Sequence, residues 1–182
     1  EITFPYTIRI VANILESNGS SSMATVCAGS LALMDAGVPC KKHIGGVALG
    51  MIKEGEKYII LTDIQGEEDH YGDLDLKIAG SKDGITGFQM DVKTDDFTLD
   101  ILKEAVFQSK KARLEILDKM YKTMPSPRNE ISIYAPKIYN VSVEPDKIGL
   151  VIGSGGKTIK RIIEETGTEI DIQEDGNIRI YS

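Results

Sequence analysis

The order of apolar and polar residues predicts a first region of short strands and two helices. Stretches rich in β-branched residues, or with alternating polarity, predict strands at 6–15, 44–52, 57–63, 74–79 and 85–92. The acidic segment 65–73 is expected to be a loop, and 22–36 and 98–124 to be helices. The first helix consists mainly of small residues and is expected to be buried on most sides. The second has an apolar face of Leu99, Leu102, Val106, Phe107, Leu114, Leu117 and Tyr121.

A smaller region follows the proline-containing break at 124–129. Its pattern predicts a strand at 138–143, helices at 145–152 and 157–166, and strands at 169–174 and 177–181. The chain is therefore expected to be α+β. We predict a domain over 1–124, a linker over 125–137, and a small βααββ unit over 138–182.

Composition narrows the possible partners. Hydrophobic residues make up 41% of the 182 residues, enough for packed cores, and the net charge of −7 means that any nucleic-acid contact depends on local patches. No stretch approaches eighteen uncharged apolar residues, so no membrane partner is expected. The chain begins without Met and closes on a strand-like run, so we expect a piece of a longer polypeptide.

The segment 63–75 contains six carboxylates in thirteen residues. A solvated surface loop would explain this charge. If a strand begins here, however, Asp73, Asp75 and Lys77 share one face and the apolar residues between them pack into the core. Hard oxygen ligands of this kind suit Mg²⁺ or Mn²⁺. Zinc is disfavoured, because His70 has no Cys or second His at ligand spacing.

The segment 17–27 reads SNGSSSMATVC and lies between a predicted strand and a predicted helix. One serine would suffice as a helix cap. A helix N-terminus with three hydroxyl groups also suits an anion such as phosphate, and both interpretations stay open. A serine hydrolase is disfavoured, because the glycine that closes a nucleophile elbow is absent.

The segment 148–163 places Gly153-Ser154-Gly155-Gly156 between two short helices. A P-loop would need glycine at position 151, which is Val. The GXXG pattern is instead that of a KH module, whose loop clamps single-stranded nucleic acid, although a plain helix–turn–helix connection stays possible. From 138 to the end there are five Lys or Arg against eight Asp or Glu, so binding should be modest and salt-sensitive.

Three motifs in this order resemble the polynucleotide phosphorylase family. They are SNGSSSMATVCAGSLALMDAG, GEEDHYGDLDLKIAGSKDGITGFQMD and IGLVIGSGGKTIKRIIEETGTEIDI. The resemblance covers nearly the whole chain. It implies a second ribonuclease-PH-like domain (the ribosomal protein S5 domain 2-like fold) without its N-terminal segment, followed by a KH domain truncated at its C-terminus.

The resemblance implies a polyribonucleotide nucleotidyltransferase activity. Inorganic phosphate degrades single-stranded RNA from its 3′ end to nucleoside diphosphates, and the reverse reaction extends RNA. It places the phosphate at Ser20, Ser21 and Ser22, with Ser21 and Ser22 the main candidates. It assigns metal binding to Asp69 and Asp75, the active-site lysine to Lys77, and proton donation to Asp75. RNA binding falls on Gly153, Ser154, Gly155, Gly156, Lys157, Lys160 and Arg161.

The resemblance further implies a cytoplasmic homotrimer that can join RNA-degradosome components. Family members also use arginines and a histidine from a segment upstream of Phe4, so the isolated 182-residue chain is expected to be inactive. Two alternatives remain at this point. One is a catalytically inactive RNA-binding ring subunit of an exosome-like assembly. The other is a metal-dependent hydrolase, which would act without phosphate.

Overall fold

The computed structural model describes residues 4–182, which form two compact units divided after Ser132. Both units combine an antiparallel sheet with helices, so the predicted α+β class is confirmed. The domain boundaries predicted at 124 and 138 lie on either side of the division and stay predictions. Residues just before the division still bond to the first unit, since Arg128 N donates to Met34 O (3.0 Å) and Ser132 N to Ala36 O (2.9 Å).

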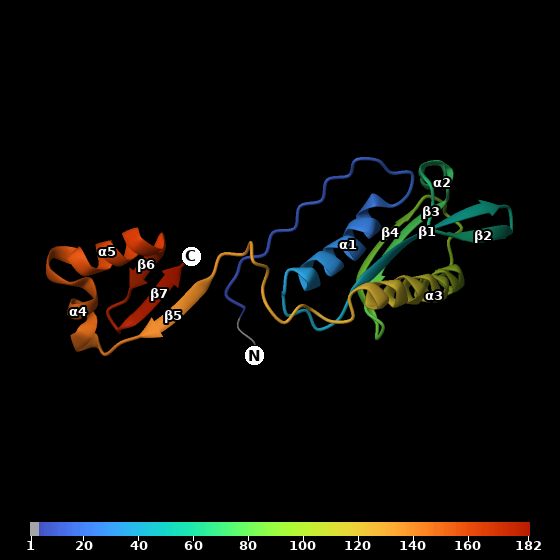
Figure 1. Cartoon of the computed structure of the whole chain (residues 1–182). Helices are drawn as coiled ribbons and strands as arrows, with labels where there is room; N and C mark the ends of the chain where they lie inside the picture. The colour runs from blue at the N-terminus through green and yellow to red at the C-terminus, as the bar shows by residue number, and fades with distance from the viewer. Residues whose placement is uncertain (1–3) are drawn as a thin grey trace. The chain divides into compact units, whose positions relative to one another are not determined.

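The first unit is built on a four-stranded sheet with the order β2-β1-β3-β4 (Figure 1). Its strands are β1 (Gly45–Glu54), β2 (Lys57–Thr62), β3 (Leu74–Gly80) and β4 (Ile85–Val92). Every neighbouring pair is antiparallel. These four strands were predicted to within two residues at each end.

Helices α1 (Ser21–Asp35) and α3 (Leu99–Thr123) pack on opposite faces of this sheet. Successive residues of a strand point to opposite faces. A Cβ at Gly45 would lie 3.1 Å from Leu117 of α3, and a Cβ at Gly46 only 2.9 Å from Met23 of α1. The two glycines of β1 therefore let both helices approach the strand closely, as Figure 1 shows for the blue and olive helices.

The main core lies between the sheet and α3. Leu74, Leu76 and Ile78 are fully buried there, which confirms the predicted alternation along β3. The apolar face predicted for α3 is partly wrong, because Leu99 and Phe107 are 75% and 72% exposed. The buried stripe is Ile101, Ala105, Ser109, Arg113, Leu117 and Met120.

Two polar residues, Ser109 and Arg113, belong to that stripe, which explains why the apolar pattern of the sequence did not identify it. Ser109 Oγ donates to Val106 O at 2.7 Å, so its hydroxyl is satisfied within the helix. The Arg113 guanidinium donates to the Ser81 carbonyl, and burial lowers the pKa of this side chain. Within residues 4–182 no helix combines the length and apolar character needed to cross a bilayer.

The strand predicted at 6–15 is wrong. Residues 4–20 form neither helix nor strand, and most are exposed. β-branched residues favour a strand only where a sheet edge offers partners, and none of the registered strand pairs includes this segment. It lies instead near α1, where a Cβ at Gly29 would be 3.7 Å from Ile10. Only Gly29 and Met34 of α1 are buried, so the expected burial on most sides is also wrong.

The acidic segment predicted as a loop contains a short helix, α2 (Gly66–Tyr71). Glu68 Oε2 accepts a hydrogen bond from Gln65 N at 2.7 Å, which satisfies one amide at the helix start. Glu67, Glu68 and Asp69 all lie in the first turn. Negative side chains are favourable there, so the same charges that suggested a loop also support a helix.

The second unit has the predicted βααββ order. Its three-stranded sheet has the order β5-β7-β6, with β5 (Ile138–Ser142), β6 (Glu169–Ile172) and β7 (Asn177–Tyr181). The first predicted helix begins as the 3₁₀ turn η1 (Pro145–Lys147) and continues as α4 (Ile148–Ile152). The 3₁₀ turn η2 (Ser154–Gly156) then leads into α5 (Lys157–Thr166).

Candidate functional site

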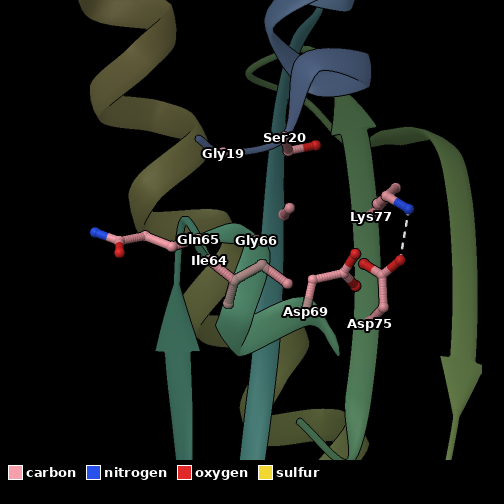
Figure 2. A pocket seen from close by; sticks show the side chains of 9 residues that line it. Gly19, Ser20, Ile64, Gln65, Gly66, Asp69, Asp75 and Lys77 are labelled. Carbon is pink, nitrogen blue, oxygen red and sulfur yellow. Dashed lines mark hydrogen bonds and ion pairs between the residues drawn. The ribbon is translucent and has the colours of Figure 1, made fainter. Parts of the chain in front are cut away.

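A small cavity on the α1 side of the sheet collects residues from separate segments of the first unit (Figure 2). Its volume is about 60 Å³. This is enough room for a small ion or a water molecule. The lining residues are Gly19, Ser20, Ala48, Ile64, Gln65, Gly66, Asp69, Asp75 and Lys77.

Strand β3 supplies Asp75 and Lys77, which project from the same face. They pair in register with Gly50 and Ala48 of β1, whose small side chains leave room above the sheet. Lys77 Nζ donates to Asp75 Oδ2 at 2.5 Å, and the two side chains are only 23% and 11% exposed. Their predicted proximity is therefore confirmed in a partly buried setting, where the charges interact more strongly than in water.

The second oxygen of Asp75 is buried without a partner. Oδ1 has no hydrogen-bond partner anywhere in the described part of the chain. Leaving a buried polar atom unsatisfied costs about 1–3 kcal/mol, and more when the group is charged. Such an atom calls for a ligand or an ion that completes its environment.

Helix α2 brings the carboxylate of Asp69 to the cavity. Figure 2 shows it facing Asp75, whereas the side chain of Gln65 points away from both. Ile64, just before the helix, packs against β1 so closely that a Cβ at Gly50 would lie 2.6 Å from Ile64 Cγ2. Asp69 therefore reaches the sheet because β1 has no side chain at position 50.

Ser20 is both a helix cap and a lining residue, so the two interpretations of the serine segment are compatible. Its Oγ accepts from Met23 N at 3.4 Å and lies 3.2 Å from Ser22 Oγ. Ser21 and Ser22, the main candidates from the sequence, are not among the residues that line the cavity. They occupy the first turn of α1, where main-chain N–H groups lack intrahelical acceptors.

Asp73 does not line the cavity with Asp75 and Lys77. Its position precedes β3, and its Oδ2 accepts from Lys53 N at 2.7 Å. The expected grouping of all three side chains thus holds for Asp75 and Lys77 at the cavity, which Asp73 does not line. The alternation of side chains begins only where the strand begins, one residue later.

The donor set fits a hard divalent cation. Asp69, Asp75 and Lys77 carry a formal net charge of −1, and one carboxylate oxygen is unpartnered. Carboxylates are the ligands that Mg²⁺ and Mn²⁺ prefer. Two carboxylates are a small set: no group of three or more His, Cys, Asp or Glu side chains within residues 4–182 is arranged to hold a metal.

The GXXG segment of the second unit is an exposed loop whose glycines are structurally required. Gly153, Gly155 and Gly156 have φ values of +74°, +60° and +77°. A Cβ at Gly153 would also lie 2.1 Å from Thr158 Oγ1. The loop therefore exposes main chain at the start of α5, as the KH interpretation requires.

The three cations near this loop remain accessible. Lys157, Lys160 and Arg161 are all exposed. Arg161 lies 3.9 Å from Glu165 across one helical turn, a weak surface pair. Lys157 and Lys160 have no ion-pair partner among the described residues.

Sequence reasoning missed the neutral part of the cavity. Gly19, Ala48, Ile64, Gln65 and Gly66 line it but carry no chemical signal of their own. It also missed Lys93, whose Nζ donates to Asp69 O at 2.5 Å. A sheet register would have been needed to place these residues, since they come from separate segments.

Comparisons with known proteins agree with the resemblance. Residues 138–181 match the KH domain family, and residues 1–39 match the 3′ exoribonuclease family, domain 1. Proteins named polyribonucleotide nucleotidyltransferase match all of the chain: 57% identity in Persephonella marina, 58% in Solibacter usitatus and 59% in Enterococcus faecalis. The chain spans about a quarter of the length of these relatives, 26% in each case. Over all of its residues, this chain is similar to polyribonucleotide nucleotidyltransferases, which confirms the resemblance to the polynucleotide phosphorylase family.

Proposed function

We propose that the chain is part of a phosphorolytic 3′→5′ exoribonuclease and that the cavity belongs to its reaction site. The convergence of Ser20, Asp69, Asp75 and Lys77 around a buried, unpartnered carboxylate oxygen is the observation that carries this proposal. The name shared by the relatives supports it. The same shared name favours an enzyme over an inactive ring subunit.

In the proposed reaction, an oxygen of inorganic phosphate attacks the phosphorus of the terminal linkage. The bond from that phosphorus to the 3′ oxygen of the preceding nucleotide breaks. A nucleoside diphosphate leaves, and the new 3′ oxygen takes up a proton. The reverse reaction adds one nucleotide to RNA. Phosphate is itself the nucleophile, so the protein needs mainly to position two phosphates and offset their charge.

The N-terminus of α1 and the hydroxyls of Ser20, Ser21 and Ser22 are proposed to hold the attacking phosphate. The aligned peptide dipoles of this 15-residue helix favour an anion at this end. Lys77 offsets negative charge beside it. Asp75 is proposed to pass the proton released by the attacking hydrogen phosphate to the leaving 3′ oxygen, and its contact with Lys77 fixes the orientation of its carboxylate.

Asp69 and Asp75 are proposed to hold Mg²⁺ or Mn²⁺. An anion placed beside two carboxylates would be repelled unless a cation lay between them. When bound, a divalent cation supplies charge neutralisation at the phosphoryl oxygens. The observation that supports this assignment is the unpartnered Asp75 Oδ1.

The second unit is proposed to bind single-stranded RNA through the GXXG loop and the cations Lys157, Lys160 and Arg161. We further propose, from the resemblance, a ring-shaped homotrimer in the cytoplasm that acts in mRNA degradation and can join degradosome components.

The test uses a chimera in which this chain replaces the matching segment of the Enterococcus faecalis relative. Ser22→Ala and Asp75→Asn should each lower phosphate-dependent RNA decay while RNA binding, measured by filter retention, is unchanged. Full activity in both variants would contradict the assignment of the site. Equal loss of RNA binding would mean that the cavity serves RNA contact rather than phosphorolysis.

A further inference from the structure

The turn between α2 and β3 connects the two carboxylates of the cavity. Asp69 lies on the helix and Asp75 on the strand, with Gly72 and Asp73 between them. We call Gly72 and Asp73 the α2–β3 corner. Its geometry influences how far apart the two carboxylates are, because the corner lies within the six peptide units that join Asp69 to Asp75.

Asp73 ties this corner to the two strands on either side of β3. Asp73 N donates to Met51 O of β1 at 2.8 Å, and Lys93 N, just past β4, donates to Asp73 O at 2.9 Å. The paired register of β1 and β3 ends at Met51 and Leu74. Beyond that point the Lys53 amide of β1 has no main-chain acceptor in β3. The Asp73 carboxylate supplies the acceptor, since Lys53 N donates to Asp73 Oδ2 at 2.7 Å.

The rest of the corner leaves little freedom. Gly72 N donates to Glu68 O at 3.0 Å, and a Cβ at Gly72 would lie 2.4 Å from that same oxygen. The carbonyl of Asp69 is in turn held by the side chain of Lys93 at 2.5 Å. A shift of Asp73 would therefore be passed on to the helix that carries Asp69.

The Asp73 carboxylate acts here as a hydrogen-bond acceptor rather than as a charge. The ammonium of Lys53 pairs with Asp96 at 3.0 Å, so it does not neutralise Asp73. Asp73 also does not line the cavity. An asparagine oxygen could accept the same bond from the Lys53 amide, whereas alanine could not.

We infer that Asp73 is a positioning residue: by bonding the Lys53 amide it holds the α2–β3 corner so that Asp69 faces Asp75. The inference rests on the proposed function, in which Asp69 and Asp75 together bind a divalent cation. It assigns no contact between Asp73 and that cation or the substrate.

The test is a Mn²⁺ titration of the 182-residue chain, followed by the electron paramagnetic resonance signal of free Mn²⁺. Asp73→Ala should weaken Mn²⁺ binding about 10-fold or more, the range seen when residues that orient metal ligands are removed. Asp73→Asn should stay within about 3-fold of the wild type, because it keeps the acceptor. Asp69→Asn reports on the metal site itself, and Glu67→Gln, an exposed carboxylate on the same helix, is the matched control.

The variants separate positioning from ligation. If Asp73→Asn weakened Mn²⁺ binding as much as Asp69→Asn, Asp73 would act through its charge and the inference would be overturned. Wild-type affinity in Asp73→Ala would overturn it as well.

Hydrogen exchange provides a readout that needs no metal. Asp73→Ala should speed amide exchange at Lys53 and through 69–73, and Asp73→Asn should not. Unchanged exchange in Asp73→Ala would reject the positioning role. If the wild type failed to bind Mn²⁺ while the exchange result held, the proposed metal site would be wrong and the role of Asp73 in the corner would stand.

Discussion

The cavity of the first unit and the GXXG loop of the second, both proposed to bind phosphate groups, are built in opposite ways. The cavity uses side chains from residues 20 to 77, among them the buried Asp75 and the exposed Asp69, which meet only in the folded sheet. The loop uses exposed main chain and cations within nine residues, 153–161. We infer that the cavity depends on long-range packing, whereas the loop depends on local backbone conformation and charge.

The largest effect should follow from removing a charge inside the cavity. In the chimera, Asp69→Asn is expected to lower the rate of phosphate-dependent nucleoside diphosphate release at least about 100-fold, because one of two candidate metal ligands is lost. Glu67→Gln, on the same helix but outside the cavity, should keep the rate within about 2-fold, the ordinary scale of an exposed substitution. Equal losses in the two variants would mean that the acidic charge of α2, and not the position of Asp69, matters.

Charge removal at the loop should act on RNA affinity and leave the chemistry intact. The double variant Lys157→Ala/Lys160→Ala should reduce the salt dependence of single-stranded RNA binding by about 1.4 units of log K per log salt, or about 0.7 per phosphate contact. Fluorescence anisotropy across a salt series measures this slope. Lys103→Ala, an exposed lysine on α3 of the other unit, is the control. An unchanged slope in the double variant would remove these lysines from the RNA contact.

The packing that brings α2 to the sheet can be tested at Gly50. Gly50→Ala would place a methyl group 2.6 Å from Ile64 Cγ2. Overpacking of this kind typically costs about 1–3 kcal/mol of unfolding free energy, measurable by urea titration. Combining it with Ile64→Ala should recover part of the loss, and Gly84→Ala, where nothing lies within 4 Å, should have little effect. Strict additivity of Gly50→Ala and Ile64→Ala would argue that the two positions are not in contact.

The smallest effect is expected at the cap of α1. Ser20→Ala should cost about 1 kcal/mol of unfolding free energy, because Met23 N loses its side-chain acceptor. Ser20→Gly should cost only a few tenths of a kcal/mol. Urea unfolding of the 182-residue chain measures both. A loss below the error of the measurement in Ser20→Ala would indicate that the hydroxyl does not cap the helix.

The sequence predicted most of the regular elements, because their signals are local. Four strands of the first unit follow the alternation or β-branched content of short segments, and the βααββ order follows from glycine and proline positions. The failures needed information from elsewhere in the fold. The segment 6–15 has strand-like residues but no partner strand, and Leu99 and Phe107 lie outside the stripe that α3 turns toward the sheet.

The same distinction applies to the candidate site. The proximity of Asp75 and Lys77 follows from the two-residue period of one strand. The convergence of Ser20, Asp69 and Asp75 at one cavity does not follow from any local period. It depends on the pairing of β1 with β3 and on the small residues of β1. Asp73 was expected beside Asp75 and Lys77 but does not line the cavity, because the strand begins one residue after it, a boundary that periodicity alone could not fix.

Phosphorolysis is tested most directly by identifying the product that the chimera forms from single-stranded RNA, with and without inorganic phosphate. Nucleoside diphosphates are expected, released only when phosphate is present. Release of nucleoside monophosphates in the absence of phosphate would contradict it, because a metal-dependent hydrolase would then explain the carboxylate cavity.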